Sequence, residues 1–240
     1  MTDIAMAASP RWETVGTVAV LDLGPGENRL NPDSIGAIDA CLDEIEDSDV
    51  RGLVTTGGGK IWSNGMDTDW IAHHPDRGAE TLEVAEHLLA RLLAFPVPTV
   101  AAIQGHAFAG GLLLALAHDL RVMRSDRGFL SLPEVNFDAV FSEGMTDLLR
   151  ARLAPQVAHR AMLMAQRYDA LAAQEAGLVD ECVPLDKLTA RACALAEEAG
   201  GRSRATVSAL KAGIYAQPLR SLGNPPPPAL VAALVNLGRS

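Results

Sequence analysis

A turn of small residues that leads into a helix of almost pure Leu and Ala constrains this chain more than any other feature. An apolar strand at residues 99–103 runs into Gly and Ala residues at 105–111, and residues 112–117 continue as Leu and Ala. A helix that is apolar all round has to be buried all round. Small residues at the junction let backbone N–H groups approach a ligand, and the free N–H groups of a helix start attract negative charge. The stretch therefore predicts a buried, anion-stabilising turn.

The composition fits a globular domain and argues against nucleic acid or membrane as a partner. Of the 240 residues, 48% are hydrophobic, and the net charge is −10. Nucleic-acid binding depends on Lys and Arg side chains that neutralise phosphates, so this charge disfavours it. The longest apolar run, residues 107–117, is shorter than the roughly 20 residues of a membrane-spanning helix. An anionic ligand would therefore have to be held by local groups.

The chain ends and the cysteines favour a cytoplasmic location. Residues 1–7 lack the basic and apolar regions of a secretory signal, and residues 238–240 do not form a peroxisomal address. Cys41, Cys182 and Cys193 have no paired spacing, which suits a reducing compartment. We expect them to be small hydrophobic residues of the core.

Alternating patterns along the chain predict an α/β fold. Residues 1–10 are expected to form a loose tail, and the polar segment 70–77 is expected to be mobile. Strands are predicted at 14–23, 52–56 and 99–103, and a short helix, a Gly stop and a strand at 172–183. Helices are predicted after the Asn31 cap and at 80–95, 112–117, 145–153, 156–166, 185–199, 204–215 and 228–237.

Several motifs, taken in order, resemble the crotonase superfamily of enoyl-CoA hydratases and isomerases. They are Ser63-Asn64-Gly65-Met66-Asp67, the run 98–107, Ala109-Gly110-Gly111, Pro133-Glu134, and the run 173–180. The resemblance covers approximately residues 12–215. Residues 105–134 look most similar to monofunctional Δ3,Δ2-enoyl-CoA isomerases.

The resemblance implies a fold and an assembly. It implies a ClpP-like spiral of β-β-α turns with C-terminal helices. Residues 1–190 would form the spiral core, and residues 191–240 a helical region that closes the pocket and joins protomers. A homotrimer, or a hexamer made of two trimers, is the implied assembly.

The resemblance also implies a site for an acyl-CoA thioester. The backbone N–H groups of Met66 and Gly110 would stabilise the thioester enolate, and losing one such donor typically costs about 3 kcal/mol. Glu134 would be the base, and its apolar surroundings at 129–132 should raise its pKa. The residues expected to bind substrate are Lys60, Asn64, Gly65, Gly111 and Leu113. No cofactor is implied beyond the CoA of the substrate, and no metal is expected.

Leu113 separates the candidate activities. Hydratases of the superfamily resemble one another in carrying a second glutamate at this position, which helps to activate water. Moving a double bond from position 3 to position 2 needs one base, so isomerase is favoured. A hydratase that uses Asp138 or Glu143 as second acid is the alternative, and a non-catalytic acyl-CoA-binding protein is a third possibility.

For the other lysine, aspartate and histidine residues, the sequence gives weaker indications of a role. Lys60 and Lys211 could contact the phosphates of CoA, whereas Asp69 is acidic where some hydratases have a lysine. His106 is expected to be a hydrogen-bonded structural residue, and the adjacent His73 and His74 should point apart on a helix. The acyl chain is expected to lie against residues 70–83 and 138–149.

Overall fold

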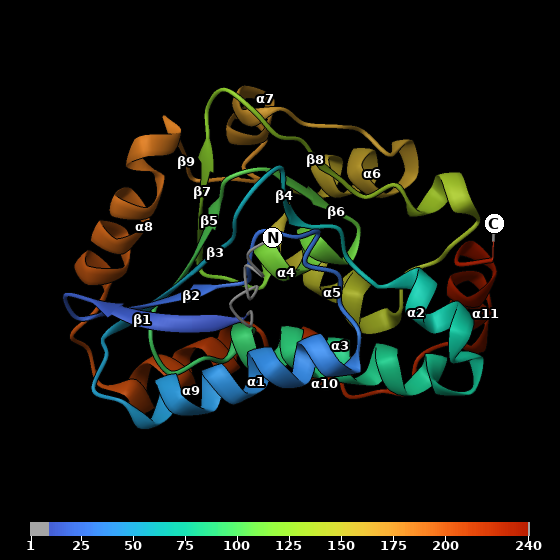
Figure 1. Cartoon of the computed structure of the whole chain (residues 1–240), viewed down its shortest axis with the longest axis horizontal. Helices are drawn as coiled ribbons and strands as arrows, with labels where there is room; N and C mark the ends of the chain where they lie inside the picture. Colours follow the sequence, from blue (N-terminus) through green and yellow to red (C-terminus); the bar gives the residue numbers. More distant parts are fainter. Residues whose placement is uncertain (1–9, 240) are drawn as a thin grey trace, which may run out of the picture.

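Two sheets organise the fold in the computed structural model, which describes residues 10–239 (Figure 1). The large sheet has the strand order β1-β2-β3-β5-β7-β9, and the small sheet has the order β4-β6-β8. All neighbouring strands are parallel except β1 and β2. The strands are β1 Arg11–Val15, β2 Val18–Asp22, β3 Gly52–Thr56, β4 Ile61–Ser63, β5 Thr99–Ile103, β6 His106–Phe108, β7 Leu120–Arg124, β8 Leu130–Ser131 and β9 Glu181–Val183.

Each long strand β3, β5 and β7 is followed by a short strand of the small sheet and then by helices. This repeated β-β-α order confirms the expected crotonase spiral. The helices are α1 Pro32–Asp47, α2 Thr68–His73, α3 Gly78–Leu93, α4 Gly110–Leu116, α5 Glu143–Arg152, α6 Pro155–Met164, α7 Ala170–Glu175, α8 Leu185–Ala199, α9 Arg204–Ile214, α10 Ala216–Ser221 and α11 Pro228–Leu237, with short 3₁₀ helices η1 Pro75–Arg77 and η2 Glu134–Phe137. The predicted tail lies, apart from residue 10, outside the described residues.

One predicted strand differs from the structure. The strand predicted at 14–23 is part of an antiparallel hairpin, because Gly16 adopts a φ of 63° and lets the chain reverse between Val15 and Val18. The segment 70–77, whose mobility stays a prediction, contains the end of α2 and the 3₁₀ helix η1. Trp70 stacks on His74 with ring centroids 4.1 Å apart, and Arg77 lies over the Trp70 ring.

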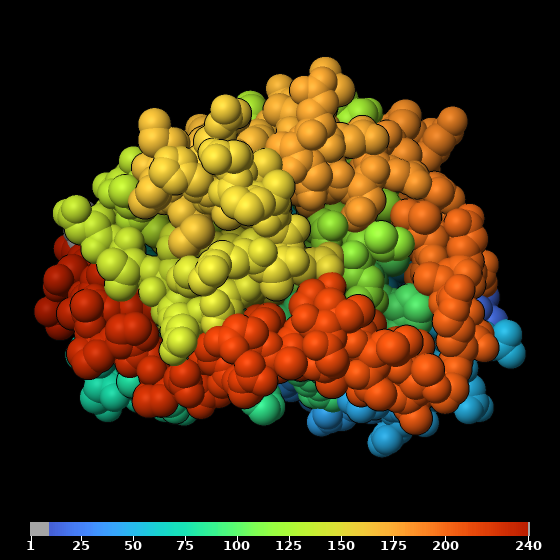
Figure 2. Space-filling model, turned by 180° about the vertical axis from the view of Figure 1, so that it is seen from behind, coloured from blue at the N-terminus to red at the C-terminus, as the bar shows by residue number. Residues whose placement is uncertain are grey.

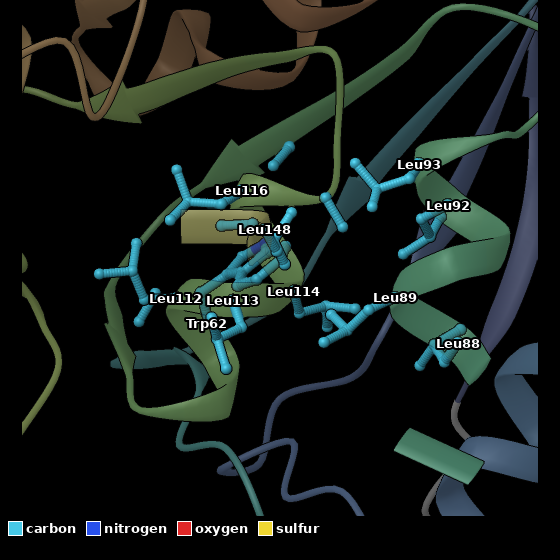
Figure 3. Packing of buried hydrophobic residues seen from close by; sticks show 14 of the residues in the cluster. Trp62, Leu88, Leu89, Leu92, Leu93, Leu112, Leu113, Leu114, Leu116 and Leu148 are labelled. Carbon is cyan, nitrogen blue, oxygen red and sulfur yellow. The ribbon is translucent and has the colours of Figure 1, made fainter. Parts of the chain in front are cut away.

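The Leu and Ala helix α4 lies in the middle of the core, as its composition predicted. Its residues 111–116 are all buried. Figure 3 shows Leu112, Leu113, Leu114 and Leu116 of α4 together with Trp62 and Leu148, on the side facing the leucines of α3. The helix is therefore fixed by packing from several directions, and so is the turn that precedes it.

The C-terminal helices run from one side of the molecule along its lower edge to the opposite end, as the orange and red segments of Figure 2 show. Helix α8 packs on β2, β3, β5 and β7 of the large sheet, where its Leu188 and Ala192 are buried against valines of the sheet. Residue 190 lies inside α8. The predicted division into a spiral core, 1–190, and a C-terminal helical region, 191–240, stays a prediction. Helix α11 lies at the other end, against α2 and α3.

Candidate active site

A cavity of about 600 Å³ lies where the three short strands end. Asn64 and Met66 follow β4, Ala109 and Gly110 follow β6, and Glu134 follows β8; all five residues line the cavity. Because the three strands are parallel, their carboxyl ends meet at one edge of the small sheet. The topology thus brings together motifs that are far apart in the sequence.

The far part of the cavity is apolar. Leu82 of α3, Met145 of α5, and Leu230 and Leu234 of α11 line it, together with residues 139–141. The two segments expected along the acyl chain, 70–83 and 138–149, both contribute to this wall. Helix α11 forms the remaining side.

The two glycine turns touch one another at the polar end of the cavity. Gly65 has a φ of 77°, and a Cβ atom there would lie 2.7 Å from the amide nitrogen of Gly110. A Cβ on Gly110 would lie 3.5 Å from the amide nitrogen of Met66. Within residues 10–239, neither of these two N–H groups donates to a protein acceptor. The pair can therefore donate to one small anionic atom in the cavity.

The second turn is held in a strained conformation. Ala109 has a φ of 52° and a ψ of −127°, a backbone region that costs non-glycine residues about 1–3 kcal/mol. Its N–H donates to the carbonyl oxygen of Ser131 at 3.0 Å, and its own carbonyl oxygen accepts from Leu112 at 2.9 Å. These bonds to β8 and to α4 fix the direction in which α4 begins. They therefore set the position of the Gly110 N–H group.

One oxygen of the Glu134 carboxyl group is withdrawn from solvent. This Oε2 atom is buried and has no hydrogen-bond partner within residues 10–239. Burial raises the pKa of Glu134 to about 7, and a backbone N–H group partly opposes this effect. A carboxyl group with such a pKa can take up and return a proton near neutral pH.

The five residues predicted to bind substrate do not all line the cavity. Asn64 and Leu113 line the cavity. Gly65 and Gly111 pack the two turns together, and a side chain on Gly111 would collide with the carbonyl oxygen of Ser63. Lys60 is exposed and is not part of the cavity wall.

The expectation that Lys211 could contact the phosphates of CoA is wrong. Its side chain is buried and donates to the carbonyl oxygen of Val97 at 2.9 Å. Its Nζ atom also pairs with Asp119 at 2.6 Å. The two proposed second acids, Asp138 and Glu143, do not line the cavity either.

The histidines have structural contacts. The N–H group of Phe129 donates to Nδ1 of His106 at 3.1 Å, and the His106 ring stacks on Phe108 and Phe129, which confirms its structural role. His73 and His74 each contact a carbonyl oxygen one turn earlier in the chain. Within residues 10–239, no group of three or more His, Cys, Asp or Glu side chains is arranged to hold a metal ion, and no helix has the length and apolarity needed to cross a bilayer.

Sequence reasoning missed two arginines on the cavity wall, Arg29 and Arg167. Arg29 precedes α1, whereas Arg167 lies between α6 and α7. Neither has a local motif around it that indicates a ligand. Their proximity to the cavity depends on how distant segments pack, so the sequence held no signal that could have found them.

Comparison with known proteins agrees with this geometry. The family model for enoyl-CoA hydratase/isomerase matches residues 13–222. The chain belongs to this family. It is therefore a crotonase-family acyl-CoA enzyme, and the resemblance seen in its motifs is confirmed.

Relatives that are named for different activities are similar to this chain. Enoyl-CoA delta isomerase 2, peroxisomal, of Arabidopsis thaliana is 37% identical over 63% of this chain and 67% of the relative. A putative enoyl-CoA hydratase of Thermus thermophilus is 35% identical over 85% of this chain and 82% of the relative. A solved protein of Mycobacterium tuberculosis, described as an enoyl-CoA isomerase in one structure and as a probable enoyl-CoA hydratase in another, superposes with a TM-score of 0.82 at 26% identity, covering 95% and 97% of the two chains in the first. These likenesses agree on the family and its fold.

Proposed function

We propose that this chain is an enoyl-CoA isomerase that moves the double bond of a 3-enoyl-CoA to position 2. One observation carries the proposal: among the described residues that line the cavity, Glu134 is the sole acidic side chain. Isomerisation removes a proton from C2 and returns one to C4, so a single base can perform both steps. The apolar side chain of Leu113, which is 1% exposed, borders the same cavity.

The proposed roles use residues that line the cavity. The thioester oxygen would accept hydrogen bonds from the N–H groups of Met66 and Gly110, which stabilise the negative charge of the dienolate. Glu134 takes the C2 proton, and its carboxylic acid then donates that proton to C4. Asn64 lies beside the thioester, and Leu113 covers it from α4. The acyl chain extends toward Leu82, Met145, Leu230 and Leu234.

Relatives support the proposal unevenly. The name of the Arabidopsis relative favours isomerase, whereas the name of the Thermus relative favours hydratase. A hydratase of the kind considered above would need a second acid, and neither Asp138 nor Glu143 lines the cavity. A protein that binds acyl-CoA without catalysis would have no use for a desolvated carboxyl group beside two free N–H groups.

The test supplies purified protein with a 3-enoyl-CoA and, separately, with a 2-enoyl-CoA. We expect conversion of the first substrate to the 2-enoyl product, loss of this activity in Glu134→Gln, and no hydration of the second substrate. Asp138→Asn, a carboxyl change outside the cavity, is the matched control and should keep the activity. Hydration of the 2-enoyl-CoA would favour the hydratase, and binding without turnover would favour the non-catalytic protein.

The proposal includes an assembly and a location. We propose a homotrimer or a hexamer, in which residues 191–240 join protomers as well as closing the cavity, and a cytoplasmic location. Light scattering of the purified protein tests the assembly, because a monomeric mass would contradict it. Fractionation of cells tests the location, which matters since the Arabidopsis relative is named as peroxisomal.

A further inference from the structure

The charge of the protein creates a problem for binding CoA. The chain has a net charge of −10, whereas the phosphates of CoA are themselves anionic. A protein with this overall charge repels such a ligand unless cations lie close to where the phosphates bind. The cavity wall should therefore carry at least one available cation.

Two cations line the cavity within the described residues, Arg29 and Arg167. Arg29 is already surrounded by carboxylates. Its guanidinium lies 2.6 Å from Glu27, 3.0 Å from Asp69 and 4.0 Å from Asp67. Its positive charge is compensated locally, and it has little capacity to attract a further anion.

Arg167 has a different environment. No carboxylate of residues 10–239 lies within ion-pairing distance of it. Its guanidinium carbon lies 4.6 Å from the centroid of the Phe129 ring and 5.6 Å from that of Phe108. Aromatic faces attract the cation without neutralising it, and the edges of the planar group stay free to donate hydrogen bonds.

Two further cations lie close enough to His106 to act on it together with Arg167. After burial, which is the largest cause, the charges of Lys60, Arg167 and Arg127 lower the pKa of His106. These three side chains thus act together on a buried imidazole at the start of β6. A positive region in an otherwise acidic protein is suited to an anionic ligand.

We infer that Arg167 binds a phosphate group of the CoA portion of the substrate. The inference rests on the proposed function in that the ligand is an acyl-CoA. Arginine donates to phosphate oxygens through two N–H groups at once, and the stack on Phe129 and Phe108 holds its plane in advance. Arg167 would then anchor the ligand while the thioester lies at the Met66 and Gly110 N–H groups.

The experiment measures binding by calorimetry with two ligands. One is a saturated acyl-CoA, and the other is the matching acyl-pantetheine, which carries no phosphate. The variants are Arg167→Met, which retains a long side chain for the phenyl rings but has no charge, and Arg167→Lys, which keeps the charge. Arg160→Gln, an exposed α6 position outside the cavity, is the matched control.

We expect Arg167→Met to raise the Kd of acyl-CoA about 10-fold or more and to weaken its dependence on salt. Binding of acyl-pantetheine should not change, Arg167→Lys should recover part of the affinity, and Arg160→Gln should resemble the wild type. Arg167→Gln provides a second uncharged variant if Arg167→Met does not fold, as judged from its Tm.

Equal weakening of both ligands would overturn the inference, because Arg167 would then act on the acyl or pantetheine part or on the structure. Unchanged binding of acyl-CoA in the folded uncharged variants would overturn it as well. The saturated ligand has no double bond to move, so failure of the isomerase proposal would leave this result readable. A wild-type protein that binds no acyl-CoA would overturn both.

Discussion

The Nζ atom of Lys211 lies 2.6 Å from Oδ2 of Asp119 and ties helix α9 to the residue before β7. The same carboxylate oxygen accepts from the backbone N–H of Thr99 at 2.8 Å. We expect Lys211→Met to lower the free energy of unfolding by about 2 kcal/mol, since it leaves a partly buried carboxylate without its cation. Urea unfolding measures this change. Affinity for acyl-CoA should be retained, and a selective loss of that affinity would restore Lys211 as a ligand contact.

The pH dependence of the reaction should report the environment of Glu134. Burial raises its pKa to about 7, and the base must be ionised to accept the C2 proton. We therefore expect kcat/KM to be low at pH 5, to rise through pH 7 and to level off above it. A pH–rate profile with a 3-enoyl-CoA checks this. A rise centred near pH 4.5 would show that Glu134 is solvated in the working enzyme.

A second buried carboxyl group should affect stability. Glu86 of α3 is 1% exposed, and its Oε1 atom has no hydrogen-bond partner within the described part of the chain. Burial raises the pKa of Glu86 to about 7; the Ser142 hydroxyl lowers it and Glu83 adds to the rise. The unfolded chain releases this proton near pH 4.5, so the folded state loses stability as the pH rises from there to about 7.

We accordingly expect Glu86→Gln to match the wild-type Tm at pH 5 and to exceed it by roughly 5 °C at pH 8. Thermal melts at the two pH values provide the measurement. Glu83→Gln, an exposed position whose charge is the smallest cause of the Glu86 shift, is the control and should reduce the pH dependence only slightly. An equal Tm difference at both pH values would mean that the carboxyl group is not titrating.

Substitutions of the adjacent Gly110 and Gly111 should affect catalysis and stability separately. A Cβ on Gly110 would lie at ordinary contact distance, 3.4 Å, from the Cα of Gly65, beside the Met66 N–H group. We expect Gly110→Ala to fold and to lose about 100-fold in kcat, because the methyl group disturbs the place where the enolate oxygen is held. Gly111→Ala should instead unfold more easily by about 2 kcal/mol or more, since its methyl group meets the Ser63 carbonyl. Activity assays and urea unfolding of both variants provide the measurement. Equal losses of kcat and of stability in the two variants would contradict the prediction.

The sequence predicted most elements because their signals are local. The strand Gly52–Thr56 and the helices Leu185–Ala199 and Pro228–Leu237 have the predicted bounds. The hairpin at Gly16 was missed because one glycine between two β-rich runs looks like part of a single strand. The resemblance, and not periodicity, supplied the spiral, since strands of two or three residues carry no pattern of their own.

Some residues of the candidate site could be predicted from the sequence, and others could not. Met66, Gly110 and Glu134 were singled out because their motifs resemble those of the crotonase superfamily, and all three line the cavity. Lys211 was misjudged, because a lysine on a helix has the same sequence signal whether it is solvated or buried against Asp119. Arg167 was overlooked for the converse reason, since its approach to the cavity depends on the packing of the loop after α6.

Helix α11 is the last segment of the cavity wall to be synthesised. Its Leu230 and Leu234 complete a wall whose other parts come from residues more than 60 positions earlier, such as Met145 and Arg167. During synthesis the two turns and Glu134 emerge from the ribosome long before this wall does. A nascent chain that stops before α11 therefore lacks the Leu230 and Leu234 side of the cavity wall.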